Sequence, residues 1–516
     1  MPLINTGGAS SAPTQVAGFS REIQLAKLKT AFGHAYIQRD STLNTPTPST
    51  SPGSPDPLAG KHVVVLGMAR QGTALARWLP TVGARVTLSD SRSADALADE
   101  ITAFGGQPVT FALGGHPLSL LDGCDVLCVS GGVPLTLPIV QEAQRRGIRV
   151  TNDAQLFVER CPAPVLGVTG SAGKTTTTAL TGAMARAAGR RTHIGGNIGD
   201  VLLDSLPQIA PGDLVVMELS SFQLELMTVS PPVSAVLNVT PNHLDRHGTM
   251  DAYRAAKANI YRHQRPDDTA IFGWDDPVAR EMSVEAPGRV AGFSLHERVP
   301  RGAYLDGGRL ALVTDAGATT VCERDAIRLR GMHNVLNTLA ACAIAWAGGV
   351  PVGAMRAAIA GFTGVAHRLE LVATLGGATW VNDSIATAPE RVMAALRSYD
   401  EPVVLLAGGR DKNLPWAPLA ALAAERCRAV IAFGEFGPQI AALMAQHMQG
   451  GARLEIVRQA SALEDAVGLA REVARPGDVV LLSPGGTSYD AYVDFAARGE
   501  HFRALVRDLA RDAGQE

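Results

Sequence analysis

The stretch VLGVTGSAGKTTTT, residues 165–178, decides how the middle of the chain folds. Its apolar, β-branched start predicts a strand, and the continuation TTTTALTGAMARAAG predicts a helix. Backbone N–H groups at the start of such a helix point at an anion, so Gly170 to Thr175 form a candidate phosphate-binding loop. The stretch departs from the pattern G-x-x-x-x-G-K-[ST], because Val168 stands where the first glycine is expected. The alternative is a glycine- and threonine-rich turn without a ligand.

Features around the loop favour nucleotide binding over a plain turn. Lys174 adds a positive charge, and Thr175 adds a hydroxyl that can bind Mg²⁺. About fifty residues further on, the apolar run in DLVVMELSSFQLE predicts a strand ending in Glu218, a carboxylate of the type that holds such a metal. A lone GKT occurs by chance, whereas strand, loop, helix and a following strand-end carboxylate rarely occur together. We therefore predict a phosphate-binding loop.

The composition is that of an ordinary globular protein. The chain has 516 residues, 46% hydrophobic and 18% charged, which is enough for about three domains. A formal net charge of -3 provides no basic field that would recruit nucleic acid or anionic lipid. Six scattered cysteines suit a reducing cytosol, and no apolar run approaches a membrane span or a signal peptide. We expect a cytoplasmic protein that binds neither nucleic acid nor membrane.

The N-terminal part of the chain has two segments of different character. Residues 41–57 are rich in Ser, Thr and Pro, so residues 1–57 are predicted to be a disordered extension. From Lys61 the pattern alternates strand, glycine turn and helix, as in a Rossmann-like domain. Its glycine fingerprint is incomplete because Ala69 replaces the second glycine, which leaves both a bound dinucleotide and a ligand-free turn open. The later strand CDVLCV ends at Ser130, where open α/β sheets place ligands.

A series of motifs then carries a resemblance. In chain order they are TGSAGKT, GGNIG, ELSSFQLE, NVTPNHLDRH, YRAAKANI, HNVLN, HRLE, NDSIATAPE, GGRDK and SPGGTSYDAYVDF. Taken singly, His243 would more often be an ordinary surface or core histidine, and Lys257 a solvated helix lysine. Together the motifs resemble the Mur ligase family, the ATP-dependent amide-forming enzymes of peptidoglycan synthesis, from about Lys61 to the C-terminus. The family's loop has the form T-G-x-x-G-K-[ST], so Val168 fits it.

The resemblance implies an α/β fold of three domains after the disordered extension of residues 1–57. We expect a Rossmann-like domain at 58–160 that binds a UDP substrate. A central P-loop mononucleotide-binding domain at 161–363 would bind ATP, and a Rossmann-like C-terminal domain at 364–516 would bind glutamate and close on the nucleotide. The protein is expected to be a monomer.

The resemblance also implies the reaction. ATP would phosphorylate the terminal carboxylate of UDP-N-acetylmuramoyl-L-alanine, and the amine of D-glutamate would attack the acyl phosphate, releasing ADP and phosphate. The expected cofactors are ATP and two Mg²⁺ ions. ELSSFQLE and SPGGTSYDAYVDF are the motifs most similar to those of the glutamate-adding member of the family.

Site residues follow from the positions that match the family's motifs. The catalytic residues are expected to be Lys174, Glu218, His243 and Lys257. The metal ligands are expected to be Thr175, Glu218, His243 and Lys257, the lysine as a carbamate, which turns a cation into a carboxylate-like ligand. The ATP-binding residues are expected to be Gly170, Ser171, Ala172, Gly173, Lys174, Thr175, Thr176, Asn334, Asn337, Arg368 and Asp383. The UDP-substrate residues are expected to be Asp90, Ser91, Arg92, Ser130, Gly132 and Asn197. The glutamate residues are expected to be Thr387, Lys412, Ser488 and Phe495.

The motif NDSIATAPE departs from the family pattern. Many relatives read D-S-K-A-T-N, with a lysine that helps bind the glutamate carboxylate, but this chain has Ile385. Losing one charge-assisted contact costs about 1.5 to 3 kcal/mol, so another cation must compensate or glutamate affinity must fall roughly ten- to a hundredfold. Lys412 is the predicted substitute. Because these donors read chirality, L-glutamate stays open as an alternative substrate.

Competing function classes have specific requirements. A Rossmann-type oxidoreductase needs a nicotinamide site, and both Ala69 and the separate phosphate-binding loop argue against it. A regulatory GTPase needs a base-reading motif such as N-K-x-D, which does not occur near the loop. A folylpolyglutamate-synthetase-like ligase shares the central domain but lacks a uridine-binding N-terminal domain, so it is the more remote alternative.

Overall fold

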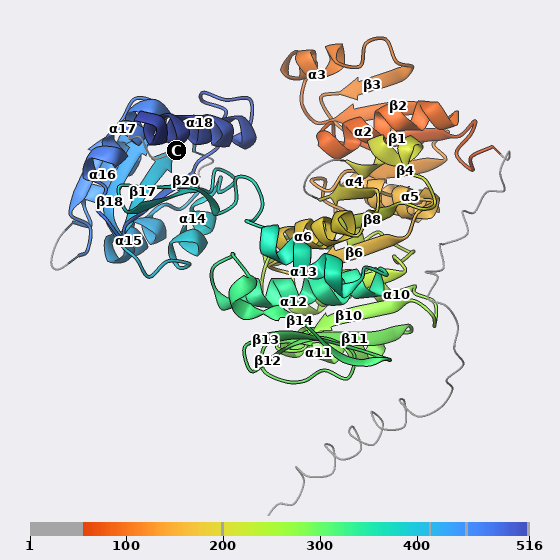
Figure 1. The fold of residues 1–516 in the computed structure, drawn as a ribbon. Helices are drawn as coiled ribbons and strands as arrows, with labels where there is room; N and C mark the ends of the chain where they lie inside the picture. Colours follow the sequence, from red (N-terminus) through yellow and green to blue (C-terminus); the bar gives the residue numbers. More distant parts are fainter. Residues whose placement is uncertain (1–54, 198–200, 412–413, 449–451, 513–516) are drawn as a thin grey trace, which may run out of the picture. The chain divides into compact units, whose positions relative to one another are not determined.

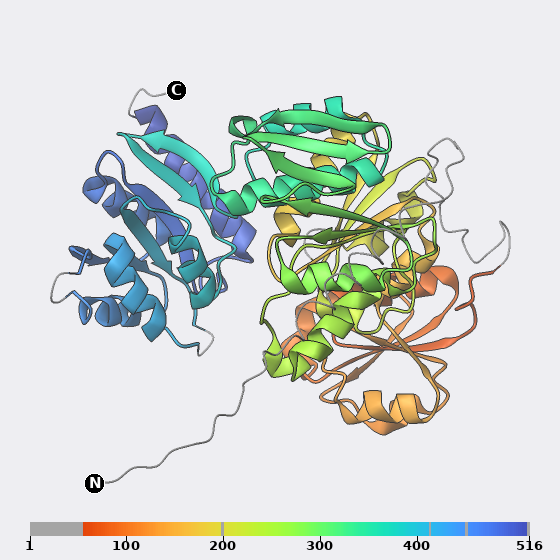
Figure 2. The ribbon, with the colours of Figure 1, turned by 90° about the horizontal axis from the view of Figure 1, so that it is seen from below.

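The computed structural model describes residues 55–197, 201–411, 414–448 and 452–512. These residues form three α/β regions, each built on its own sheet (Figures 1 and 2). The predicted fold class, with Rossmann-like first and last regions and a central P-loop region, is confirmed. The predicted disorder falls mostly on residues 1–54, outside the described residues, and the domain boundaries remain predictions.

The first region is a parallel five-stranded sheet in the order β3-β2-β1-β4-β5. Its strands are β1 (His62–Leu66), β2 (Arg85–Asp90), β3 (Val109–Leu113), β4 (Val126–Val129) and β5 (Arg149–Thr151). Its helices are α2 (Arg70–Trp78), α3 (Ala98–Thr102), α4 (Pro138–Arg145) and α5 (Asp153–Arg160), with short 3-10 helices η1 (Leu79–Val82), η2 (Asp95–Leu97) and η3 (Leu118–Leu121). In such a doubly wound sheet, ligands bind beyond the carboxyl ends of the strands near the reversal of order, here between β1 and β4. Asp90 and Ser130 lie at that edge.

The central region is a nine-stranded sheet in the order β14-β13-β12-β11-β10-β9-β6-β8-β7. Its strands are β6 (Val165–Thr169), β7 (Thr192–Gly196), β8 (Leu214–Glu218), β9 (Val233–Val236), β10 (Thr269–Gly273), β11 (Arg289–Ser294), β12 (Gly302–Asp306), β13 (Arg309–Thr314) and β14 (Gly317–Glu323). The sheet is parallel from β7 to β12, and β12 to β14 form an antiparallel meander.

Helices cover both faces of the central sheet. They are α6 (Lys174–Ala187), α7 (Leu202–Ser205), α8 (Ser221–Leu224), α9 (Leu244–His247), α10 (Met250–Arg262), α11 (Pro277–Met282), α12 (Met332–Ala347) and α13 (Val352–Gly361), with short 3-10 helices η4 (Leu206–Gln208), η5 (Ser283–Glu285) and η6 (Arg324–Ala326). Strand β8 is a continuous apolar run because both of its faces are buried. Val215 and Met217 belong to the core that also contains residues of the first region, whereas Leu214 and Val216 belong to the core that contains α6 and α12. A parallel strand that is buried on both faces needs such a continuous apolar run.

One hydrophobic core extends from the first region into the central one. It includes Phe157 of α5, Leu202 of α7 and Met227, which follows α8. The predicted boundary at residues 160 and 161 therefore separates two sheets but lies within a shared core.

The third region is a six-stranded sheet in the order β15-β16-β20-β17-β18-β19. Its strands are β15 (Glu370–Leu375), β16 (Ala378–Asn382), β17 (Val403–Gly408), β18 (Cys427–Phe433), β19 (Ile456–Gln459) and β20 (Val479–Gly485). Its helices are α14 (Pro389–Leu396), α15 (Ala417–Arg426), α16 (Gly437–Ala445), α17 (Leu463–Val473) and α18 (Phe495–Asp512). Among the described strands of this region, only the edge strand β15 pairs antiparallel, and separate cores fill the two faces of the sheet.

No helix in the described ranges is both long and apolar enough to cross a bilayer. All six cysteines are buried free thiols.

Candidate active site

The turn between β6 and α6 has the geometry of an anion-binding loop. Gly173 has a φ of 83°, and a Cβ at this position would lie 2.3 Å from Oδ1 of Asn337. Both the left-handed backbone and the close approach require glycine here. Asn238, just after β9, accepts from Ala172 N at 2.8 Å and donates to the Ala172 carbonyl at 3.2 Å. The predicted loop residues are thus gathered at the start of α6, with Asn337 against them.

Lys174 is folded back over the loop. Its Nζ donates to the Gly170 carbonyl at 2.8 Å. Burial lowers the pKa of Lys174, nearby Glu218 opposes that effect, and the charges of Arg368 and Arg391 lower it further. A phosphate in the loop would favour the charged amine, because an anion stabilises a neighbouring cation.

Glu218 ends β8 as a buried carboxylate with one oxygen engaged. Asn197 Nδ2 donates to Glu218 Oε1 at 3.0 Å, and the Asn197 amide donates to the Glu218 carbonyl at 2.9 Å. Within the described part of the chain, Glu218 Oε2 is buried without a hydrogen-bond partner. Such an oxygen is costly to bury, and a hard cation such as Mg²⁺ would satisfy it. Asn197, predicted to bind the UDP substrate, therefore also orients Glu218.

Lys257 lies inside the molecule on α10, 1% exposed. Its Nζ donates to Thr169 Oγ1 at 3.4 Å and lies 4.5 Å from the centre of the Tyr253 ring. Burial lowers the pKa of Lys257 to about 6, and the charge of Lys174 contributes. At neutral pH the amine is therefore largely neutral, which is the form that can add CO₂ to give a carbamate.

His243 precedes α9 and is exposed, with a φ of 54°. A non-glycine residue in this region is uncommon, and such backbone strain clusters at functional sites. No group of three or more His, Cys, Asp and Glu side chains comes together as a metal site among the described residues. A cation at Glu218 would thus also need oxygens from Thr175, from a phosphate or from a modified Lys257.

Arg368 extends from the third region to the phosphate-binding loop. Its Nη1 donates to Thr175 Oγ1 at 3.1 Å. Its neighbours His367 and Leu369 have φ values of 63° and 42°. The two left-handed residues on either side of Arg368 cost roughly 1–3 kcal/mol each, so the surroundings must hold this turn in place.

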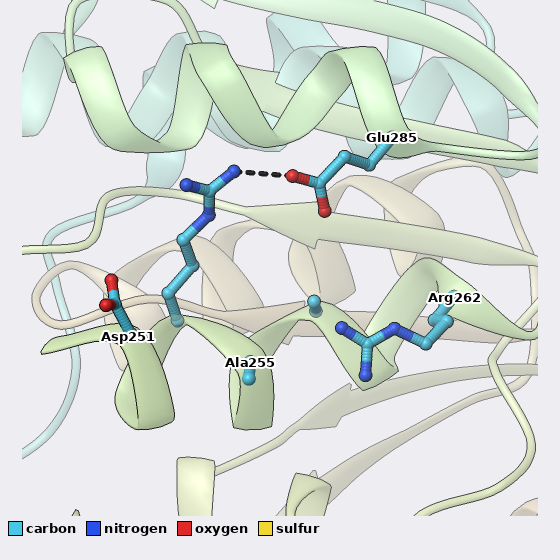
Figure 3. Close-up of a pocket in the computed structure, with 6 residues that line it drawn as sticks. Asp251, Ala255, Arg262 and Glu285 are labelled. Carbon is cyan, nitrogen blue, oxygen red and sulfur yellow. Dashed lines mark hydrogen bonds and ion pairs between the residues drawn. The ribbon is translucent and has the colours of Figure 1, made fainter. Parts of the chain in front are cut away.

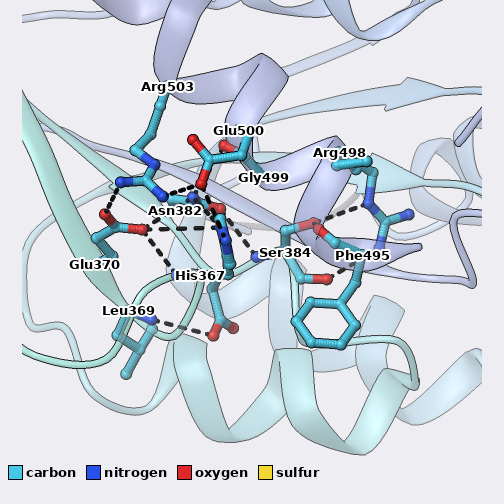
Figure 4. A network of polar contacts seen from close by, with 12 residues as sticks. His367, Leu369, Glu370, Asn382, Ser384, Phe495, Arg498, Gly499, Glu500 and Arg503 are labelled. Atoms are coloured by element: carbon cyan, nitrogen blue, oxygen red, sulfur yellow. Dashed lines mark hydrogen bonds and ion pairs between the residues drawn. The ribbon is translucent and has the colours of Figure 1, made fainter. Parts of the chain in front are cut away.

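A polar network holds the strained turn (Figure 4). Glu370 accepts from the His367 amide at 2.7 Å and from Asn382 Nδ2 at 3.1 Å, and it pairs with Arg503 at 3.2 Å. Asn382 Nδ2 also lies 3.1 Å from His367 Nδ1. Sequence reasoning missed the contact of Asn382, the first residue of NDSIATAPE, with the HRLE turn, and it missed Arg503, which lies in none of the quoted motifs.

Asp383 and Arg391 lie close to Arg368. Burial raises the pKa of Asp383 to about 7, although a hydrogen bond from Ser483 and the charges of Arg368 and Arg391 act to lower it. Arg391 Nη1 donates to the Ile385 carbonyl at 3.1 Å. The positive charge of Arg391 acts to lower the pKa of both Asp383 and Lys174. Sequence reasoning also missed Arg391, although a basic residue just after NDSIATAPE was a usable signal.

The predicted glutamate residues border two loops of the third region. Thr387 is half-buried, Ser488 is buried, and Phe495 starts α18. Buried Arg498 joins these loops, donating to the Ser384 carbonyl at 3.0 Å and the Thr487 carbonyl at 3.2 Å. Ser384 Oγ in turn donates to the Phe495 carbonyl at 2.8 Å (Figure 4).

Lys412, the predicted substitute for the missing lysine at position 385, lies outside the described residues. Its role in binding glutamate therefore remains a prediction.

Asn334 and Asn337 lie side by side on α12. Asn337 Nδ2 donates to Asn334 Oδ1 at 3.1 Å, and Asn334 Nδ2 donates to the Arg330 carbonyl at 2.8 Å. The pair extends from the phosphate-binding loop towards the exposed start of α12.

The predicted UDP-substrate residues lie at the carboxyl edge of the first sheet. Asp90 accepts from the Met68 amide at 2.7 Å and from Arg92 Nε at 3.0 Å. Burial acts to raise the pKa of Asp90, but hydrogen bonds from Arg92 and Met68 outweigh that effect and lower the pKa to about 2. Ser130 Oγ donates to the Gly67 carbonyl at 3.1 Å. In a dinucleotide-binding domain, an acidic residue at the end of β2 binds the ribose. Here that residue, Asp90, instead accepts a hydrogen bond from Met68 in the turn after β1.

Ser91 and Gly132, the other two residues predicted on the first sheet, lie beside Arg92 and Ser130 in sequence. Ser91 is exposed and Gly132 is exposed as well, so both are accessible to a ligand at this edge.

Family models match all three regions. The model "Mur ligase MurD-like, N-terminal domain" matches residues 61–152, "Mur ligase middle domain" matches 168–345, and "Mur ligase, glutamate ligase domain" matches 367–486. The chain belongs to the Mur ligase family.

Relatives of this Mur ligase match along most of its length. It is 42% identical over 453 residues to the UDP-N-acetylmuramoylalanine--D-glutamate ligase of Symbiobacterium thermophilum, covering 87% of this chain and 98% of the relative. It is 40% identical over 452 residues to the enzyme of the same name from Pelotomaculum thermopropionicum, with the same coverage. The solved structure of UDP-N-acetylmuramate-alanine ligase from Thermotoga maritima shares the fold, at 18% identity and a TM-score of 0.51, over 87% of this chain and 99% of that one.

A cavity of about 210 Å³ lies elsewhere on this Mur ligase, beside α10 (Figure 3). It is lined by Asp251, Arg254, Ala255, Ala258, Arg262 and Glu285. Arg254 already pairs with Glu285 at 2.5 Å, and none of the predicted site residues lines the cavity. We assign no ligand to it.

Proposed function

We propose that this Mur ligase joins D-glutamate to UDP-N-acetylmuramoyl-L-alanine, with ATP converted to ADP and phosphate, in the synthesis of peptidoglycan precursors. One structural observation carries the ATP-dependent part. The phosphate-binding loop, in which Gly173 leaves no room for a side chain, follows β6, and the neighbouring strand β8 ends in Glu218, a buried carboxylate with one oxygen that lacks a hydrogen-bond partner among the described residues. The choice of substrates rests on relatives named for this ligation that match over 98% of their length.

The residues suit a two-step amide ligation. In the first step, an oxygen of the alanine carboxylate bonds to the γ-phosphorus of ATP, and the bond from that phosphorus to ADP breaks. In the second step, the glutamate nitrogen bonds to the acyl carbon, the bond to phosphate breaks, and the nitrogen loses a proton. Lys174 and the loop N–H groups of residues 170–175 stabilise charge on the transferred phosphoryl group.

Thr175, Glu218, His243 and Lys257 would hold Mg²⁺, which neutralises phosphate charge during transfer. The unsatisfied oxygen of Glu218 and the hydroxyl of Thr175 fit a hard cation. The neutral amine of Lys257 suits its conversion to a carbamate. We further propose two metal ions, one held by Thr175 and Glu218 and a second at His243.

Substrate contacts are proposed at the edges of the three sheets. The uridine nucleotide would bind at the first sheet, ATP between the loop, α12 and Arg368, and glutamate between Thr387, Ser488 and Phe495. The boundaries at 58–160, 161–363 and 364–516, a monomeric state and a cytoplasmic location belong to the same proposal.

A second candidate is the same ligation with L-glutamate. It is favoured by Ile385, which cannot donate to the substrate carboxylate where many relatives carry a lysine.

Product analysis tests the proposed function. Purified protein would be incubated with ATP, Mg²⁺, UDP-N-acetylmuramoyl-L-alanine and D-glutamate, and the uridine-containing products identified by mass spectrometry. We expect a product that gains one glutamyl residue and requires both ATP and the wild-type Lys174. Unchanged substrate in the complete mixture would reject the proposal.

A further inference from the structure

Arg246 connects two parts of the proposed site that belong to different sheets. Its Nη1 donates to the Gly131 carbonyl at 3.1 Å, and its Nη2 donates to the Val133 carbonyl at 2.6 Å. These carbonyls lie in the loop after β4 that contains Gly132, which we place in the UDP-substrate site. Arg246 itself lies on α9, three residues after His243. One side chain therefore joins the substrate loop to the segment that carries a proposed metal ligand.

A stack of rings fixes the guanidinium in place. Arg246 lies over the ring of Phe222, with Cζ 4.2 Å from the ring centre. The same ring lies 5.1 Å from that of His243 and is stacked on His247 at 5.2 Å, with 11° between the planes. Phe222 is part of α8, which follows β8 and Glu218. Stacking on an aromatic face holds a planar guanidinium in one orientation, so the directions of its N–H donors are set.

The contacts continue from this stack to the phosphate-binding loop. The ring of His247 lies 5.2 Å from that of Tyr253, whose hydroxyl is 3.0 Å from Ser171 Oγ in the loop. The Tyr253 ring also lies under Lys257 Nζ at 4.5 Å. An unbroken series of contacts thus runs from the substrate loop, through Arg246, to the residues around the transferred phosphate.

We propose that Arg246 is a positioning residue for the UDP substrate: it sets the loop of residues 131–133 relative to His243 and the phosphate-binding loop. The inference rests on the proposed function, because it assumes that the substrate bound at the first sheet presents its carboxylate to the nucleotide. Only arginine offers two coplanar N–H donors to two carbonyls while it stacks on a ring. A lysine would keep the charge but bind one carbonyl at a time.

The alternative is a purely structural role. Arg246 would then stabilise the junction of the two sheets, and its loss would lower the melting temperature and affect all substrates alike. A positioning role instead affects the UDP substrate selectively, because in the proposed function only that substrate contacts the loop that Arg246 holds.

Variants of Arg246 distinguish the two roles. Arg246→Gln and Arg246→Lys would be compared with Arg254→Gln, which removes an arginine from α10 that pairs with Glu281 and Glu285. For Arg246→Gln we expect the KM for UDP-N-acetylmuramoyl-L-alanine to rise about ten- to a hundredfold, as for loss of a charged hydrogen bond. The KM of Arg246→Lys for the UDP substrate should lie between those of Arg246→Gln and wild type. The KM for ATP should stay within about twofold of wild type in all variants. The Arg254→Gln control should leave every KM unchanged.

Phe222→Leu provides a variant that keeps the arginine but removes the ring beneath it. We expect the KM for the UDP substrate to rise in the same direction by a smaller factor. Titration calorimetry of that substrate without ATP would report the binding loss independently of turnover, and melting curves would report folding.

An unchanged KM and Kd for the UDP substrate in Arg246→Gln and Phe222→Leu would contradict the inference. Equal rises in the KM values for the UDP substrate, ATP and glutamate, together with a lower melting temperature, would also contradict it, because a structural role predicts that result. A wild-type enzyme that forms no glutamyl product contradicts the proposed function instead, and calorimetry still shows whether Arg246 affects binding of the uridine substrate.

Discussion

Lys174 is the single charge on which the proposed nucleotide site depends most. It is half-buried at the start of α6 and folded over the loop. Lys174→Ala should remove roughly 3 to 5 kcal/mol of transition-state stabilisation, a fall of about a hundredfold or more in kcat. Steady-state phosphate release would measure it, and near-native turnover in this variant would mean that the loop does not bind ATP.

Variants of Lys257 test whether this residue is a carbamate. Lys257→Ala should be nearly inactive but partly recover with added short carboxylic acids, which can occupy the vacated ligand position. Lys257→Arg is the matched control and should not recover, because its guanidinium remains in place. Activity assays with and without added acid would check this. The same response in both variants would exclude a carbamate at this residue.

Arg391 and Lys412 are the two candidates to replace the missing lysine at position 385. Arg391 contacts the Ile385 carbonyl and acts electrostatically on Asp383 and Lys174. Arg391→Gln should lower kcat/KM for glutamate about ten- to a hundredfold, the effect of one charge-assisted contact. Arg397→Gln, an exposed arginine at the end of the same helix, should have no effect. If only Lys412→Ala lowers kcat/KM for glutamate, the role belongs to Lys412.

Individual site residues were predictable where they end a strand or start a helix. Glu218 follows an apolar run, and Lys174 follows a glycine loop, so local pattern was enough to locate both. The partners of Arg246 and Arg391 were not predictable, although Arg246 lies in NVTPNHLDRH and Arg391 directly follows NDSIATAPE, because the backbone carbonyls that they bind belong to loops that only the fold brings close.

At the scale of elements, the junction of α5 and α8 should produce a pH-dependent stability. Asp153 starts α5, its Oδ2 accepts from Gln223 Nε2 at 3.3 Å, and its Oδ1 is buried without a partner in the described part of the chain. Burial raises the pKa of Asp153 to about 6. The folded pKa lies above the unfolded value of about 3.9, so ionisation destabilises the folded state as pH rises from about 4 to 6.

Asp153→Asn cannot ionise and should escape this penalty. The unfolding free energy of the variant relative to wild type should increase by about 1–2 kcal/mol between pH 4.5 and pH 7.5. Urea unfolding at the two pH values would measure it, with the exposed Asp99→Asn as control. A difference that does not change with pH would show that Asp153 titrates normally.

The buried parallel strands were the most predictable elements. The apolar runs at residues 62–66, 85–90, 165–169 and 214–218 all form strands. The short helices α8 and α9 and the left-handed backbone at His243 and His367 were not predicted. Their conformation depends on contacts between distant segments, such as the bond from Asn382 to His367, rather than on local propensity.

At the scale of the whole chain, three sheets each present one carboxyl edge with polar residues. The alternation of strands and helices predicted this architecture, because parallel sheets need helical crossovers. The shared core between the first two regions was not predictable, because an apolar helix face such as that of α5 does not reveal which sheet it will cover.

The proposed ligation is specific for D-glutamate, and phosphate release with each glutamate enantiomer tests that specificity. Purified protein would receive ATP, Mg²⁺ and UDP-N-acetylmuramoyl-L-alanine, with D-glutamate, L-glutamate or neither. We expect rapid phosphate release with D-glutamate and only background release with L-glutamate or without an amino acid. Release that depends only on L-glutamate, or that is the same in all three mixtures, would contradict it.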